Sequence, residues 1–215
     1  MSHEASIRPE KLILVPAVIT LAVTLLRLVG ELQGWSPALF SRAAGGGGSL
    51  VGISWLVPVF GAWFGWRLGR AGERPASLWR ALGLTVLALA ILPLSGFLAA
   101  KLGVPEVSLK TLLIYAVVSI AGLIVALRAW PALGRTLLVY GLAARIPVAL
   151  VMLAAILGSW GTHYDVAPPN FPAMPAVNKW LIIGLLPQLT IWLWFTNVIG
   201  GLFGIVAGAI ARRGR

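Results

Sequence analysis

The sequence contains no cysteine and very little charge. Of its 215 residues, 11% are charged and 59% are hydrophobic, whereas about a quarter of the residues in a soluble domain are charged. So few charged groups leave too little polar surface to cover a water-soluble globule. The absence of cysteine also excludes disulfides, thiolate metal ligands and cysteine nucleophiles. We therefore expect a protein that uses the lipid bilayer as its solvent.

Histidine and recognisable catalytic motifs are also scarce. His3 and His163 are too few for a multi-histidine metal centre, and neither a phosphate-binding glycine loop nor a serine–histidine–acid set is present. We expect no metal and no cofactor. The formal net charge of +11 could indicate nucleic acid. No basic domain remains outside the apolar segments, however, and Lys and Arg of membrane proteins gather in cytoplasmic loops, so we expect no nucleic-acid partner.

Long apolar runs dominate the rest of the chain. About 20 apolar residues cross the hydrocarbon layer as a helix, and strand alternation is absent. The sequence therefore predicts an all-α fold, a polytopic bundle of six kinked transmembrane helices that forms a single domain over residues 1–215. The six predicted spans are 12–31, 49–68, 78–102, 111–130, 136–160 and 180–211. Five of them contain a proline that can bend the helix, at Pro16, Pro58, Pro93, Pro147 and Pro187.

The distribution of Lys and Arg predicts the orientation. With a cytoplasmic N-terminus, eleven of these residues flank the inner ends of the spans and four flank the outer ends. The positive-inside rule then places both termini in the cytoplasm of a prokaryotic-style inner membrane. An odd number of spans would put Arg212, Arg213 and Arg215 outside, against the rule.

Arg145 is the most informative single residue. Nine residues into the predicted span 136–160, it lies about 14 Å deep, near the bilayer midplane. An arginine at that depth is costly unless it faces the bundle interior and finds partners or water. Gln188, Thr190 and Ser119 are predicted at similar depth and offer hydrogen-bond acceptors. These four residues are the candidate ligand-binding site; polar contacts that merely join helices are the alternative.

Four further polar residues are predicted at the outer mouth. Arg27 and Glu31 are spaced i,i+4, which favours an ion pair, although Glu31 could instead face an external cavity. His163 and Asp165 follow in the outer loop 161–179, where they could act as an acid/base pair or simply be solvated. No ligand spacing supports a metal site among them.

Small residues recur on the last span, at Gly200, Gly204 and Gly208. Glycine at every fourth position makes a groove that allows another helix to approach closely. The stripe predicts either packing within the chain or association with a second copy or a partner membrane subunit. This last span is about 48 Å long, so it must tilt, break near Gly200–Gly201 or project into the cytoplasm.

Six helices, cytoplasmic termini and a long first external loop resemble the substrate-capturing subunits of bacterial vitamin transporters. The resemblance covers architecture alone. Those subunits carry an Ala-x-x-x-Ala pattern on the first helix, whereas Ala17 and Ala22 here are five residues apart. No residue role is transferred.

Three function classes follow from these patterns. Transport of a small solute or anion is favoured by Arg145, the prolines and an outer mouth that loops can cover. A non-catalytic assembly or scaffold subunit is favoured by the glycine stripe and the scarcity of charge. A lipid-active membrane enzyme would use Arg145 to hold phosphate and His163 or Asp165 for proton transfer. Of the three classes, the enzyme is the least favoured interpretation.

Overall fold

A computed structural model describes residues 9–46, 49–104 and 108–213. Within these ranges the chain is helical, without β-strands. The first five long helices are α1 (Pro9–Leu32), α2 (Leu56–Arg70), α3 (Leu78–Lys101), α4 (Leu109–Leu127) and α5 (Pro131–Gly158). The last rod is made of four consecutive pieces, α6 (Ala176–Lys179), a π-helical turn (Trp180–Leu185), α7 (Leu186–Leu189) and α8 (Ile191–Arg213). A short 3₁₀ turn, Ala44–Gly46, lies in the loop after α1.

Five of these helical segments are long and apolar enough to cross a membrane, which is the property of a multi-pass membrane protein. They are Lys11–Leu32, Leu78–Lys101, Leu109–Leu127, Pro131–Gly158 and Ala176–Ala211. The predicted span 49–68 differs, because its helix α2 begins only at Leu56 and has 15 residues. The segment before it is irregular because Gly52 and the preceding glycine-rich stretch offer little helix propensity.

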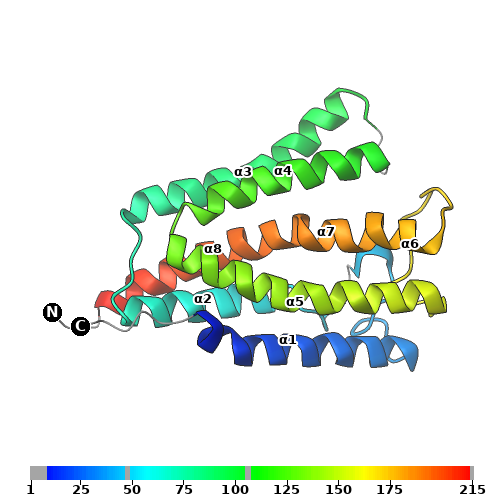
Figure 1. Ribbon diagram of the computed structural model, residues 1–215, viewed down its shortest axis with the longest axis horizontal. Coiled ribbons are helices and arrows are strands. Elements are labelled where there is room, and N and C mark those ends of the chain that lie inside the picture. Colours follow the sequence, from blue (N-terminus) through cyan, green and yellow to red (C-terminus); the bar gives the residue numbers. More distant parts are fainter. Residues whose placement is uncertain (1–8, 47–48, 105–107, 214–215) are drawn as a thin grey trace.

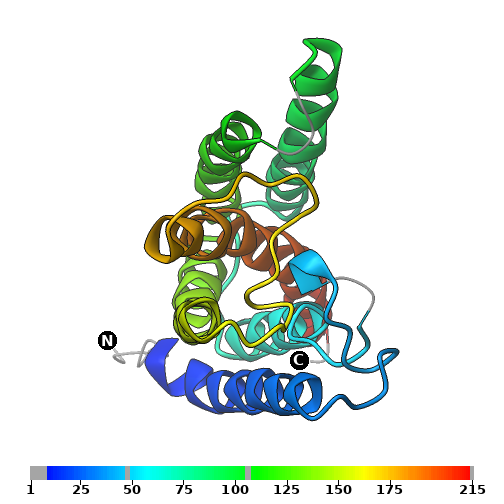
Figure 2. The same cartoon turned by 90° about the vertical axis from the view of Figure 1, so that its right-hand side faces the viewer.

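The long helices run side by side, and successive ones alternate in direction (Figure 1). As a result, α1 begins and α8 ends at the same end of the bundle. Helix α8 is central, because it packs against α2, α3, α4 and α5, while α1 covers α5 from the opposite side. Figure 2 shows the α3–α4 pair standing away from α1 on the far side of α8.

Glycines bring α2 and α8 into very close contact. Gly61, Gly65 and Gly69 of α2 face Gly200, Gly204 and Gly208 of α8 in the same order, so the two helices are parallel. A Cβ at Gly65 would overlap the carbonyl oxygen of Gly204, and one at Gly69 would lie 2.8 Å from that of Gly208. The glycine stripe is therefore used for packing within the chain. Association with a second copy or a partner subunit stays a prediction.

Two of the helix irregularities considered from the sequence are absent: a break at Gly200–Gly201, which was one of three alternatives for the last span, and a bend at Pro58. The last span does not break at Gly200–Gly201, which are helical; it departs from α-helix at Trp180–Leu185 and again at Thr190, with φ −122° and ψ −77°. Pro187, between these points, cannot donate a backbone hydrogen bond, which explains the irregularity there. Pro58 lies in the first turn of α2, where no intrahelical bond is lost, so it does not kink that helix.

Candidate functional site

A cavity of about 400 Å³ lies among α1, α4, α5 and the broken last rod. Arg145, Gln188 and Trp192 line its deep part, and Thr111, Leu112 and Tyr115 of α4 form one wall. Two loops also line it, one through Gly45, Gly46, Gly52 and Ile53, the other through His163, Tyr164, Val166, Pro168 and Phe171. The cavity therefore joins two predicted midplane residues, Arg145 and Gln188, to two predicted mouth residues, Arg27 and His163.

Arg145 lies in the middle of α5, about 21 Å from its first residue at 1.5 Å per residue. It is only 3% exposed, so its guanidinium is buried inside the protein. The centre of the guanidinium lies 4.5 Å from the centroid of the Trp192 ring, which is cation–π geometry. Its Nε has no hydrogen-bond partner, and in the described part of the chain no carboxylate pairs with it. The charge is thus stabilised by an aromatic face but not neutralised.

Gln188 lines the same cavity as Arg145 and belongs to the broken part of the last rod. Its side chain is 7% exposed. The amide nitrogen donates a weak hydrogen bond to Met152 Sδ at 3.7 Å, and among the residues described here the amide oxygen has no partner. A buried amide in this state retains hydrogen-bonding capacity for a ligand.

The other two predicted midplane residues do not line the cavity. Thr190 is buried and donates its hydroxyl to Leu186 O at 2.7 Å, which satisfies it within its own helix. Ser119 is fully buried in α4, and its hydroxyl finds no partner among the described residues. Depth along the membrane normal was the basis for grouping these residues, and it does not determine which side of a helix they occupy.

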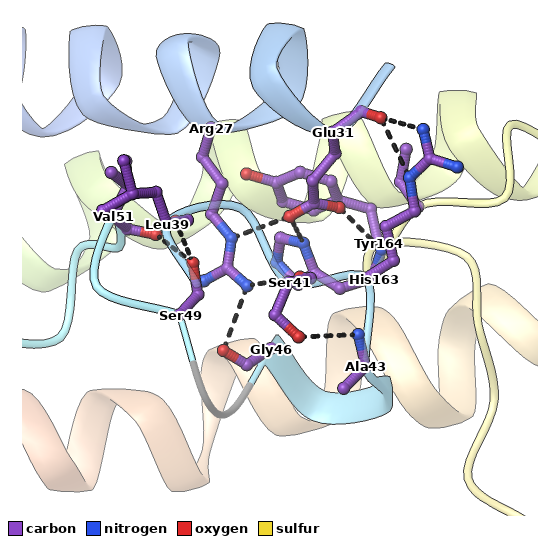
Figure 3. Close-up of polar contacts among 12 residues, drawn as sticks. Arg27, Glu31, Leu39, Ser41, Ala43, Gly46, Ser49, Val51, His163 and Tyr164 are labelled. Carbon is purple, nitrogen blue, oxygen red and sulfur yellow. Dashed lines mark hydrogen bonds and ion pairs between the residues drawn. The ribbon is translucent and has the colours of Figure 1, made fainter. Parts of the chain in front are cut away.

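At the C-terminal end of α1 a charged cluster joins three segments of the chain (Figure 3). Arg27 Nε donates to Glu31 Oε1 at 2.8 Å, the predicted i,i+4 pair. The other oxygen of Glu31 accepts from the backbone N–H of His163 at 2.8 Å, and His163 Nδ1 lies 2.5 Å from Oε1. Glu31 is completely buried, so it does not face an external cavity. Its charge is matched by Arg27 and solvated by His163.

The same cluster fastens both cavity-lining loops to α1. Arg27 also donates to the carbonyl oxygens of Ser41 and Gly46 at 3.1 and 3.0 Å, and Arg42 donates to the carbonyl of Glu31. In the second loop, the Tyr164 hydroxyl donates to Thr24 O at 3.2 Å. The two loops are therefore held over the cavity by hydrogen bonds to the last turns of α1, from Thr24 to Glu31.

Asp165 has a local structural role. Its carboxylate accepts from the backbone N–H groups of Gly161 and Thr162 and from the Thr162 hydroxyl, at 2.7 to 2.9 Å. It does not line the cavity. Within the described ranges no three His, Cys, Asp or Glu side chains gather as metal ligands. The predicted acid/base pairing of His163 with Asp165 is not what the geometry provides, because His163 turns to Glu31.

Burial shifts the pKa values of His163 and Tyr164, which both lie in the second loop. Desolvation lowers the pKa of the His163 imidazole, although its hydrogen bond to Glu31 opposes this effect. Desolvation raises the pKa of the Tyr164 phenol, so that it remains a neutral donor. A solvated loop, the simpler prediction for this segment, would show neither effect.

Several residues of the site were missed from the sequence. Trp192, Gly46 and Arg42 were not among the predicted site residues. Elsewhere between α1 and α5, Thr20 Oγ1 and Tyr140 Oη lie 2.9 Å apart, and Tyr140 belongs to the same core cluster as Ile205. No sequence spacing signals contacts between segments so far apart in the chain.

Comparison with known proteins adds no relative: no family model, no curated protein and no solved structure matches the chain. The fold and the cavity therefore define the protein only as an all-helical chain with several helices able to cross a membrane.

Proposed function

We propose that this chain is a multi-pass inner-membrane transport protein that binds a small anion at Arg145 and carries it across the bilayer. One observation supports this most strongly: a deeply buried, unneutralised guanidinium beside a cavity. On insertion scales, an arginine at the bilayer centre costs about 2.5–3.5 kcal/mol. Without a carboxylate among the described residues to offset that cost, an anionic ligand is the missing partner.

The broken last rod supports transport further. In many transporters, discontinuous membrane helices meet the substrate near the midplane, and π-helical turns occur frequently at functional sites. Here the π-helical turn and the irregular Thr190 flank Gln188, which lines the cavity with Arg145. This backbone irregularity therefore falls at the candidate binding site.

The proposal includes six crossings with both termini cytoplasmic. Helix α2 is short, and we propose that residues 49–55 complete its crossing in irregular form. Such backbone is tolerated at membrane depth only where it is covered by protein or lines a cavity. Gly52, Ile53 and Ser54 of this segment line the cavity, which supports their placement at that depth.

The two alternatives have less support. A scaffold subunit was inferred from the glycine stripe, but α2 covers that stripe within the chain. A lipid-active enzyme requires an available proton-transfer group. His163 and Asp165 are engaged by Glu31 and by the turn at Gly161–Thr162 respectively, so neither is free to act.

Uptake into proteoliposomes tests the proposal. The purified chain is reconstituted, and entry of radiolabelled chloride, phosphate, acetate and octanoate is followed. We expect uptake of at least one of these anions by the unaltered protein and its loss in Arg145→Gln, because glutamine is polar but carries no charge to bind the anion. Arg135→Gln is the matched control, since Arg135 is on the same helix but exposed. Uptake that survives in Arg145→Gln, or no uptake of any anion, contradicts the proposal.

A further inference from the structure

The cavity has one unmatched charge. Of the two arginines that line it, Arg27 is paired with Glu31 at 2.8 Å. Arg145 has no such partner in the described chain, and no aspartate or glutamate is found among the described residues that line the cavity. A ligand that carries one negative charge would therefore neutralise the site, whereas a dianion would leave one negative charge without a partner.

The remaining wall is largely hydrocarbon. Apolar side chains from α1, α4, α5 and both loops surround the space, among them Val23, Ile53, Leu112, Val148, Met152 and Phe171. The volume of about 400 Å³ lies in the range of about 300–1,000 Å³ that encloses small organic ligands. A bare inorganic anion would leave this apolar wall in contact with water, at a cost proportional to its area.

Resting on the proposed function, we infer that the ligand is an amphiphilic monoanion, with a carboxylate-like head at Arg145 and an apolar body that extends toward the two loops. Gln188 also lines the cavity, four residues before Trp192, and by turning its amide it can donate its NH₂ group to the head. The head replaces the missing countercharge, and the body fills the apolar part of the cavity. An uncharged apolar ligand would leave the guanidinium unneutralised.

Calorimetric titration of the detergent-solubilised full chain tests this substrate class. Octanoate is the probe, with acetate lacking the apolar body, octanol lacking the charge and octylammonium reversing it. Titrations into protein-free micelles supply the background. We expect saturable binding of octanoate and binding at least tenfold weaker for the other three, because a hydrogen-bonded charge and a buried chain each contribute that much or more.

Two variants separate the two halves of the ligand. Arg145→Gln removes the charge, and Val148→Phe fills the space beside it without changing charge. Each is expected to weaken octanoate binding at least tenfold, whereas Arg135→Gln binds as the unaltered protein does. Each variant is measured only as a monodisperse species. Unchanged binding in Arg145→Gln contradicts a head at Arg145, and unchanged binding in Val148→Phe contradicts an apolar body beside it.

The failures of the two proposals are distinguishable. If acetate binds as tightly as octanoate and Arg145→Gln weakens both, the amphiphile inference is overturned while the anion site stands. If octanoate binding is absent, or if octylammonium binds equally well, the amphiphile inference is also overturned. If octanoate binding is unchanged in Arg145→Gln, both the inference and the anion site at Arg145 fall.

Discussion

Glu31 illustrates how much a single residue contributes here. It is completely buried, yet both of its oxygens are occupied, by Arg27 from its own helix and by His163 from 132 positions later in the chain. A buried carboxylate with one partner removed would cost several kcal/mol. The cluster therefore stabilises the fold only as a complete unit, and His163 is the member that titrates nearest to neutral pH.

Stability should fall with acidification because of His163. Burial holds the pKa of its imidazole below the unfolded value of about 6.5. Between the two pKa values the unfolded chain binds a proton that the folded chain does not. The contribution of His163 to the stability of the fold is therefore complete above about pH 6.5. It is lost as the pH falls through the pKa of the folded state. We expect the melting temperature to drop between pH 7.5 and 5.5, by roughly 2–4 °C per kcal/mol lost.

His163→Asn is the matched variant for this measurement. Asparagine keeps a donor near the Nδ1 position but does not titrate, so the melting temperature should depend less on pH. Arg27, Glu31, Tyr164 and Asp165 surround the site and are present in both proteins, so the difference isolates the imidazole. An equally steep pH dependence in the variant would show that another group is responsible.

At the scale of the element, α2 and α8 are joined by opposed glycines and not by large side chains. Gly65 is at the centre of this contact, where no room exists for a Cβ. Helices that approach so closely gain dispersion contacts between their backbones. As a result, the face of α2 that meets α8 does not tolerate larger side chains. Any shift of α2 would also move residues 49–55, the cavity-lining segment just before it.

Gly65→Ala should lower the free energy of unfolding by about 1–3 kcal/mol, because the added methyl group must push the two helices apart. Gly83→Ala is the matched control. A Cβ at Gly83 on α3 would meet nothing within 4 Å, so this change should be neutral or stabilise by up to about 1 kcal/mol through helix propensity. Thermal unfolding in detergent micelles measures both. Equal effects of the two changes would refute the close glycine contact.

At the scale of the whole molecule, alternating helices place the connections in two groups at opposite ends of the bundle. The loops that cover the cavity are at one end, and the turns after α2 and α4 are at the other. The excess of Lys and Arg flanks the second end. The positive-inside rule therefore predicts that the cavity loops are extracytoplasmic.

Single cysteines test this orientation, since the sequence has none of its own. Ala76 and Ala173 are both exposed. Ala76 is in the connection from α2 to α3 and Ala173 is in the loop before α6, and these connections lie at opposite ends of the bundle. We expect a membrane-impermeant maleimide to label Ala173→Cys in intact cells and to label Ala76→Cys only after permeabilisation. The reverse pattern would mean that the chain is inserted the other way, and labelling of both in intact cells would mean that the two ends share one side.

The sequence by itself determined the features that depend on neighbouring residues. Apolar run length predicted the helices that are able to cross a membrane, spacing predicted the Arg27–Glu31 pair, and the glycine repeat predicted a close helix contact. Local composition could not predict that α2 starts at Leu56 or that the last rod breaks at Thr190. Only the tertiary structure decided which distant segments meet: His163 with Glu31, Gly65 with Gly204, and Arg145 with Trp192 and the cavity. The physical reason is that helix length and periodicity are set along the chain, whereas the partner of each buried group is set by how the helices pack.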